Sequence, residues 1–172
     1  MEPLSFYEST NSLKFYLIDC DSGLMHLIVF PDETVMLFFF FLTEDNKDRI
    51  INLLKRIIPQ KDDKQEIDIF VNSHRDRDHL RGLKEINANF KIKSIWDSGQ
   101  SGANIDNADY KYYMYLKRKL KEENENNVYI LVPSNLAIAT FGNADIYCFS
   151  AEADFEENYV CEAQMSVKKQ HT

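Results

Sequence analysis

The sequence predicts a single α/β domain, and three observations lead to that class. Two apolar runs of strand length, residues 13–19 and 24–30, open the chain and are joined by the turn Cys20-Asp21-Ser22-Gly23. Segments with helical spacing of apolar residues then alternate with further strand-like runs. Within residues 67–96 a strand, a helix and a strand follow one another, which is typical of a parallel βαβ unit with a right-handed crossover.

Length and composition bound the class of protein. The 172 residues are 44% hydrophobic and 13% aromatic, so residues 1–172 fit one domain with a real core. A formal net charge of -8 argues against an extended nucleic-acid surface. The three cysteines are far apart and form no CxxC pair, which predicts buried thiols and not a disulfide framework. The N-terminus has no signal-peptide pattern, and the longest apolar run is too short to span a membrane, so we expect a cytoplasmic protein without a membrane partner.

The elements of the first half follow from local patterns. The phenylalanine-rich run 35–42 predicts a fully buried strand. Residues 43–46 provide an N-cap and acidic first turn for a helix that ends near Ile58, before Pro59. A charged loop over residues 60–66 leads to the next strand, residues 67–71.

The second half predicts fewer and shorter elements. We expect helices at 80–89 and 109–123, and strands at 92–96, 128–132, 136–140 and 145–149. Residues 151–172 show no strong periodicity, which predicts a fold that is incomplete at the C-terminus.

The most informative segment is residues 73–79, Ser-His-Arg-Asp-Arg-Asp-His, directly after the predicted strand 67–71. An apolar strand that ends in two imidazoles and two carboxylates predicts a site at the sheet edge. Nitrogen and oxygen ligands without sulfur suit zinc, manganese or iron. The alternative is a solvated strand-to-helix turn in which Asp78 caps the following helix.

The motif Ser73-His74-x-Asp76-x-Asp78-His79-x-x-Gly82 resembles the metal motif of the metallo-β-lactamase superfamily. It is most similar to the branch related to the competence protein ComEC, in which Asp replaces the second His. The segments 15–23 and 96–99 are similar to the leading strand and to a later loop of that branch. The resemblance implies a metallo-β-lactamase-like αββα sandwich.

The resemblance also implies the roles of individual residues. His74 and Asp76 would bind one metal, and Asp78 and His79 a second, with Asp78 also holding the nucleophilic water. The cofactor would be a divalent metal, zinc first and manganese or iron as alternatives. Three arginines near the motif, Arg75, Arg77 and Arg81, would bind an anionic substrate such as a small phosphodiester or a nucleic-acid end; surface solubility is the competing explanation for them.

Two departures from the family pattern motivate an alternative. The acidic residue that usually ends the strand before the first helix is replaced here by phenylalanine at Phe39, and no later ligand strand is evident before Thr172. The leading hypothesis is a metal-dependent hydrolase. The alternative is a non-catalytic module that acts by binding a partner or by forming a homo-dimer that covers exposed sheet.

Overall fold

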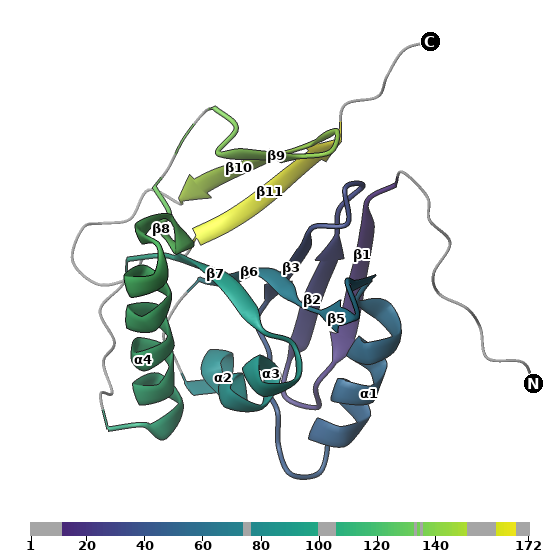
Figure 1. Ribbon diagram of the computed structural model, residues 1–172, viewed down its shortest axis with the longest axis vertical. Helices are drawn as coiled ribbons and strands as arrows, with labels where there is room; N and C mark the ends of the chain where they lie inside the picture. Colours follow the sequence, from purple (N-terminus) through teal and green to yellow (C-terminus); the bar gives the residue numbers. More distant parts are fainter. Residues whose placement is uncertain are drawn as a thin grey trace, which may run out of the picture.

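The computed structural model describes residues 12–73, 77–99, 106–132, 134, 136–150 and 161–167, and of these it gives the backbone alone for 77–78, 149–150 and 161–167. The described residues form a layer of helices, a six-stranded sheet and a three-stranded sheet (Figure 1). The mixed α/β class predicted from the sequence is therefore confirmed.

The strands of the large sheet are β1 (Lys14–Asp19), β2 (Leu24–Val29), β3 (Val35–Phe38), β6 (Ile67–Asn72), β7 (Ile92–Asp97) and β8 (Val128–Ile130). The helices are α1 (Lys47–Ile57), α2 (Arg77–Leu80), α3 (Leu83–Asn89), α4 (Ala108–Glu123) and the 3₁₀ turn η1 (Glu125–Asn127). The small sheet contains β9 (Ala139–Phe141), β10 (Ala144–Ser150) and β11 (Cys161–Val167), and a separate hairpin contains β4 (Gln60–Lys61) and β5 (Lys64–Gln65).

The large sheet joins an antiparallel half to a parallel half. Its order is β1-β2-β3-β6-β7-β8; the pairs among β1, β2 and β3 are antiparallel, whereas β3, β6, β7 and β8 pair in parallel. The predicted parallel βαβ unit is confirmed by the β6–β7 pairing. Because β1, β3, β6 and β7 run in the same direction, their C-terminal ends meet at one edge of the sheet.

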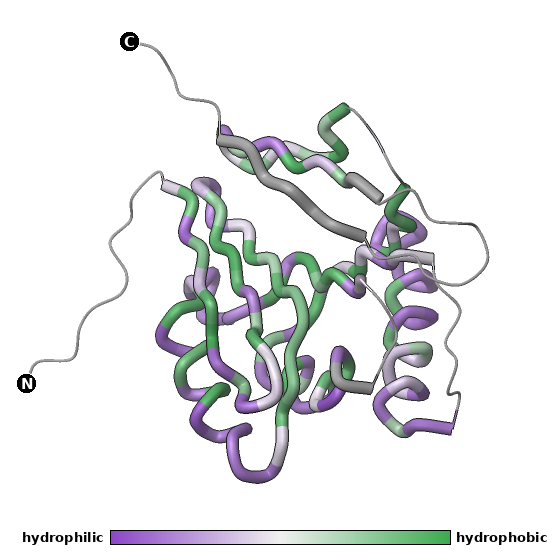
Figure 2. Tube along the Cα trace, turned by 180° about the vertical axis from the view of Figure 1, so that it is seen from behind, coloured by the Kyte–Doolittle hydropathy of each residue, from purple (hydrophilic) through white to green (hydrophobic). Residues whose placement is uncertain are grey.

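Each face of the large sheet has its own core. The helix-covered face buries apolar residues of α1, α3 and α4, such as Leu54, Ile86 and Leu116. The other face packs residues such as Ile28 against β10, whose Ile146 is also buried. Figure 2 shows the hydrophobic stretches of the strands running through the interior between these layers. No helix of the described chain is both long and apolar enough to cross a membrane.

The phenylalanine-rich strand is shorter than predicted. Strand β3 ends at Phe38, and Phe39 has a φ angle of 45°, in the left-handed region that a bulky residue rarely adopts. The chain turns here because Phe40 and Leu42 pack in the helix-side core, while the ring of Phe39 points elsewhere. The prediction of a continuous strand over residues 35–42 was therefore wrong.

The helix expected at residues 80–89 begins earlier and is divided in two. Helix α2 covers Arg77–Leu80, and α3 begins at Leu83 after Gly82, whose φ is 93°. A Cβ atom at Gly82 would lie 2.4 Å from Cβ of Leu42, so only glycine permits this close contact. The glycine of the motif therefore has a structural role.

Two strand assignments were missed. The predicted loop 60–66 contains the β4–β5 hairpin, and the aperiodic tail contains β11, which pairs with β10 along its whole length. In both cases the pairing with a neighbouring strand, and not a local alternation of residues, defines the strand. Of the three thiols, Cys20 and Cys148 are buried as predicted, and the side chain of Cys161 lies outside the described residues.

Candidate functional site

The sequence motif follows β6 at the edge where the C-terminal ends of the parallel strands meet. Asn72, the last residue of β6, is the register partner of Asp97, the last residue of β7. Two residues earlier on each strand, Phe70 and Ile95 point into the helix-side core. Because side chains alternate along a strand, Asn72 and Asp97 also lie on the helix-covered face.

The structure describes only part of the predicted ligand set. Outside the described residues lie His74, Arg75 and Asp76 and the side chains of Arg77 and Asp78. The backbone places Asp78 as the second residue of α2, so the suggestion that it is the N-cap of that helix was wrong. His79 and Arg81 are described, and both lie next to the C-terminal edge of β3.

His79 packs against Phe39, the residue that stands where a carboxylate was expected. The two ring centroids are 4.0 Å apart and the ring planes are nearly perpendicular, at 87°. On its other side the Phe39 ring touches Gly23, where a Cβ atom would lie 2.5 Å from Cε1 of Phe39. Phe39 thus fills the space between the β1–β2 turn and α2, and gives His79 an aromatic neighbour.

A buried ion pair anchors the end of β7 to α4. The side chain of Asp97 is fully buried, and its Oδ2 accepts hydrogen bonds from the Tyr113 hydroxyl, at 2.6 Å, and from the Lys117 ammonium. Its Oδ1 accepts the backbone N–H of Gly99 at 2.8 Å. Three donors around one buried carboxylate compensate for its loss of hydration.

Asn72 is the unusual polar group at this edge. Its side chain is only 1% exposed, and neither Oδ1 nor Nδ2 has a hydrogen-bond partner among the residues that the structure describes. An unpaired buried amide costs about 1–3 kcal/mol, so native proteins rarely retain one without a reason such as a bound water, ion or substrate. Asn72 immediately precedes the motif, which makes this orphaned amide part of the candidate site.

A cleft of about 150 Å³ lies beside the motif, on the side of α1 and α3. Its lining combines the cations Lys47 and Arg81 with carboxylates, and consists of Leu42, Thr43, Glu44, Lys47, Arg81, Gly82, Glu85 and Asp109. Lys47 pairs with Glu44 at 2.6 Å, and the Arg81 guanidinium lies 4.9 Å from the centre of the Phe41 ring. The cleft therefore contains both signs of charge; Arg81 lines it, whereas Arg75 and the side chain of Arg77 lie outside the described residues.

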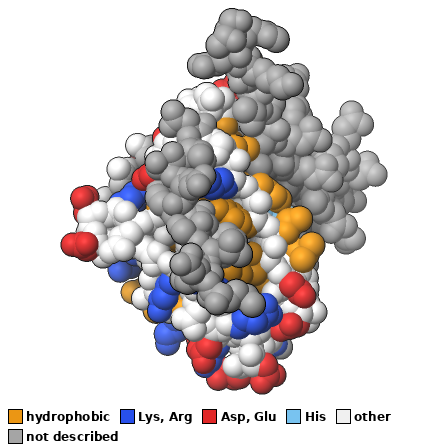
Figure 3. Space-filling view, turned by 90° about the vertical axis from the view of Figure 1, so that its right-hand side faces the viewer, with side chains coloured by type: hydrophobic (Ala, Val, Ile, Leu, Met, Phe, Trp, Pro, Cys, Tyr) orange, Lys and Arg blue, Asp and Glu red, His pale blue; other side chains and the backbone are white. Residues whose placement is uncertain are grey.

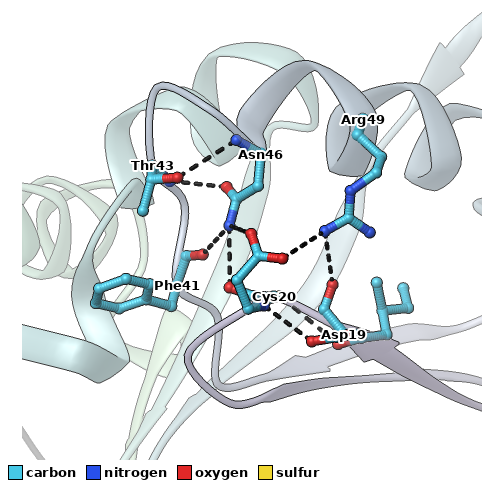
Figure 4. Close-up of polar contacts among 8 residues, drawn as sticks. Asp19, Cys20, Phe41, Thr43, Asn46 and Arg49 are labelled. Atoms are coloured by element: carbon cyan, nitrogen blue, oxygen red, sulfur yellow. Dashed lines mark hydrogen bonds and ion pairs between the residues drawn. The ribbon is translucent and has the colours of Figure 1, made fainter.

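The β1 end of the same edge is held by a polar network around Asn46 (Figure 4). Nδ2 of Asn46 donates to the backbone oxygens of Cys20 and Phe41 and to Oδ2 of Asp21, at 3.0–3.1 Å, and its Oδ1 accepts the N–H of Thr43 at 2.8 Å. This network joins the β1–β2 turn, the β3–α1 loop and α1. Within it, burial raises the pKa of the Cys20 thiol, so Cys20 is not a thiolate nucleophile at neutral pH.

Sequence reasoning missed the polar neighbours of the motif. Asn72 has a visible signal, a polar residue at the end of an otherwise apolar strand. Lys117 has a weaker one, because it lies one helical turn after Tyr113 on the face of α4 that packs on the sheet. Tyr113 packs in the helix-side core, and its hydroxyl also donates to Asp97.

Among the described side chains, no three His, Cys, Asp or Glu residues lie together in a way that could hold a metal ion. The side chains of His74, Asp76 and Asp78, three of the four predicted ligands, lie outside that set. No known protein-family model matches this chain, and no curated protein matches it in sequence.

Proposed function

We propose that this protein is a metal-dependent hydrolase of the metallo-β-lactamase type, with a small phosphodiester or a nucleic-acid end as its substrate class. The proposed ligands are His74, Asp76, Asp78 and His79. The observation that supports the proposal most directly is the buried amide of Asn72, which has no partner within the described part of the chain and lies just before this ligand-rich segment.

The position of the motif also supports a site. Ligands in open α/β sheets bind at the C-terminal ends of parallel strands, and residues 73–79 follow β6 at that edge. The neighbouring strand ends there in a buried carboxylate, Asp97, and strand β3 ends beside His79. The C-terminal ends of three parallel strands, β3, β6 and β7, therefore lie at the edge where the segment begins.

The donor set fits a divalent metal. Two imidazoles and two carboxylates provide nitrogen and oxygen ligands of the kind that zinc, manganese and iron(II) accept. A metal bound there would lower the pKa of a coordinated water, so that hydroxide forms near neutral pH. The amide of Asn72 has one acceptor and two donor hydrogens, and is suited to orient that water or a substrate oxygen.

The remaining residues of the edge hold the site in place. Asp97 fixes the Ser98–Gly99 turn through the N–H of Gly99, and its ion pair with Lys117 fixes α4 against the sheet. Gly82 permits the break between α2 and α3 that places Arg81 in the cleft beside the motif. Arg81 and Lys47 are the cations of that cleft and would contact the anionic part of the substrate.

The contact between Phe39 and His79 favours a second candidate, a non-catalytic module that has kept the fold and lost the chemistry. A ring 4.0 Å from His79 stands where the family pattern has a carboxylate, and it offers the imidazole no negative charge. A carboxylate hydrogen-bonded to a ligating imidazole increases its basicity and orients it, so its loss weakens metal binding.

Metal analysis of protein purified without chelator, by inductively coupled plasma mass spectrometry, separates the two candidates. The hydrolase proposal expects near-stoichiometric zinc, manganese or iron, lost in the double variant His74→Ala/His79→Ala. Absence of metal, even after incubation with each of the three ions, would contradict it and leave the non-catalytic module.

The matching activity test uses Asp78→Ala, with Asp48→Ala as the control on the exposed surface of α1. Hydrolysis of a chromogenic phosphodiester should fall by roughly 100-fold or more in Asp78→Ala, because both a metal ligand and the holder of the attacking water are removed. The control should retain the wild-type rate, and circular dichroism should show both variants folded. Equal rates in wild type and Asp78→Ala would rule out the proposed mechanism.

A further inference from the structure

Strand β1 forms one outer edge of the large sheet, and its free side has no strand partner in the described chain. The N–H of Cys20 donates to the carbonyl of Gly23 at 3.0 Å, which continues the hydrogen-bonded pairs of β1 and β2. Because these pairs alternate along an antiparallel ladder, the even-numbered residues of β1 bond to β2. The backbone groups of Phe15 and Leu17 therefore point away from the sheet.

The side chains at this edge are apolar and exposed. Phe15 is 48% and Leu17 59% exposed, and they lie on the face opposite the helices, as their register partners Ile28 and His26 do. The small sheet covers Ile28 on this face but leaves Phe15 and Leu17 open. Figure 3 shows hydrophobic side chains gathered on the side of the molecule where β1 lies.

Edge strands are normally protected by a lysine, a proline or a bulge within the strand. Residues 15–18 of β1, Phe-Tyr-Leu-Ile, contain none of these. The opposite edge of the sheet, β8, has only three residues and offers much less backbone. Strand β1 is thus the edge of the large sheet that is most open to pairing.

We propose that β1 pairs in antiparallel fashion with β1 of a second copy of the chain, about a two-fold axis at Tyr16. Phe15 then lies opposite Leu17 of the second copy, and Leu17 opposite its Phe15. Both residues have outward-pointing backbone groups, so each of these two pairs exchanges both N–H···O hydrogen bonds. The result is a continuous sheet across the dimer, and it does not depend on the proposed hydrolase function.

The self-complementary sequence of the strand favours a second copy over another partner. The strand is self-complementary, because the two-fold axis makes the exposed Phe15 and Leu17 neighbours on the same face. The pairing stops before Asp19, whose carbonyl already accepts a hydrogen bond from Arg49 at 3.2 Å.

The first test is the mass in solution, by size-exclusion chromatography with light scattering. The wild type should elute at twice the chain mass of 20.2 kDa at micromolar concentrations, and dimer formation should strengthen with salt because each copy has a net charge of -8. Leu17→Lys should be monomeric, whereas Leu136→Lys, the same change at a side chain 77% exposed outside the strands, should stay dimeric. A wild type that is still monomeric at about 100 μM, a concentration at which even a weak dimer would form, would overturn the proposal.

The second test fixes the register by disulfide cross-linking. The two copies of residue 16 face each other across the axis in a non-hydrogen-bonded pair, with Cα atoms about 4.5 Å apart, within the range of a disulfide. Tyr16→Cys should therefore give a covalent dimer on a non-reducing gel. Lys14→Cys, on the same face of the same strand, should not, because its two copies lie about 13 Å apart along the strands. Equal cross-linking of both variants, or of neither in a protein that light scattering finds dimeric, would overturn the register and the proposal.

Discussion

Two asparagines at the same edge of the sheet, Asn46 and Asn72, are equally buried but differ in their hydrogen bonding. Each is 1% exposed. Asn46 binds three acceptors and one donor from two separate segments, the β1–β2 turn and the β3–α1 loop, whereas Asn72 has no hydrogen-bond partner among the described residues. A buried amide whose donors and acceptor are all hydrogen-bonded stabilises the fold. A buried amide without hydrogen bonds lowers stability, so its presence needs another explanation. The Asn46 network is therefore part of the architecture of the fold, and the contrast supports the proposal that a ligand or water binds at Asn72.

The largest expected effect comes from the buried neighbour of Asn72. Asp97→Ala should lower the free energy of unfolding by about 3–5 kcal/mol, because it leaves the largely buried Lys117 ammonium without its counter-charge. Urea denaturation followed by circular dichroism measures this loss. The double variant Asp97→Ala/Lys117→Met should recover part of it, and a loss below about 1 kcal/mol in Asp97→Ala would mean that the ion pair is solvated.

Asn46→Leu should have the next largest effect, a loss of about 2–4 kcal/mol. It removes several hydrogen bonds at once and leaves the carbonyls of Cys20 and Phe41 without that donor. Asn126→Leu, at an exposed position of η1, is the control and should change stability by no more than about 0.5 kcal/mol. Similar urea midpoints for both variants would contradict the architectural role of Asn46.

Asn72→Leu should act in the opposite direction. Replacing an unpartnered buried amide with an apolar side chain of similar shape should leave stability unchanged or raise it by up to about 2 kcal/mol. Metal content or phosphodiester hydrolysis should fall, as expected where a site is kept at the expense of stability. A loss of stability as large as that of Asn46→Leu would show that Asn72 has a structural partner, and the contrast between the two regions would disappear.

The smallest expected effect concerns pH and the face of the sheet away from both asparagines. Burial lowers the pKa of His26, so the folded state releases the proton of this imidazole more readily than the unfolded chain does. The neutral form is favoured by folding, and the associated stability is present above the unfolded pKa and decreases as the pH falls through the folded pKa. His26→Leu should therefore show a flatter stability curve between pH 7 and pH 5; an unchanged curve would mean that other groups dominate.

Much of the fold could be predicted from local sequence. The meander, helices α1 and α4 and the parallel βαβ unit follow from apolar periodicity and turn residues, because those signals lie within each segment. The end of β3 at Phe38 could not be predicted, since a run of four phenylalanines has no internal punctuation and the turn at Phe39 depends on Gly23, far away in sequence. Strand β11 depends in the same way on its pairing with β10.

The site could be predicted only as a segment. The residue types and their spacing directly after a strand indicated residues 73–79. This prediction needs no information about tertiary contacts. The buried triad of Asp97, Tyr113 and Lys117 brings β7 together with a helix that begins eleven positions later, and no local pattern predicts which face of α4 meets Asp97. The contact of Phe39 with His79 is of the same kind, a pairing of residues 40 positions apart.

The Asn46 network also has a consequence for how the chain reaches its native state. Its contacts span 25 and 26 positions at most, and all of them lie between the first strand and the first helix. Closing loops of that size costs little chain entropy, so the antiparallel half has a short-range route to its own structure. The parallel half can pair its strands only after two crossover connections have formed. We therefore expect the amides of β2 to gain protection from hydrogen exchange before those of β7 during refolding.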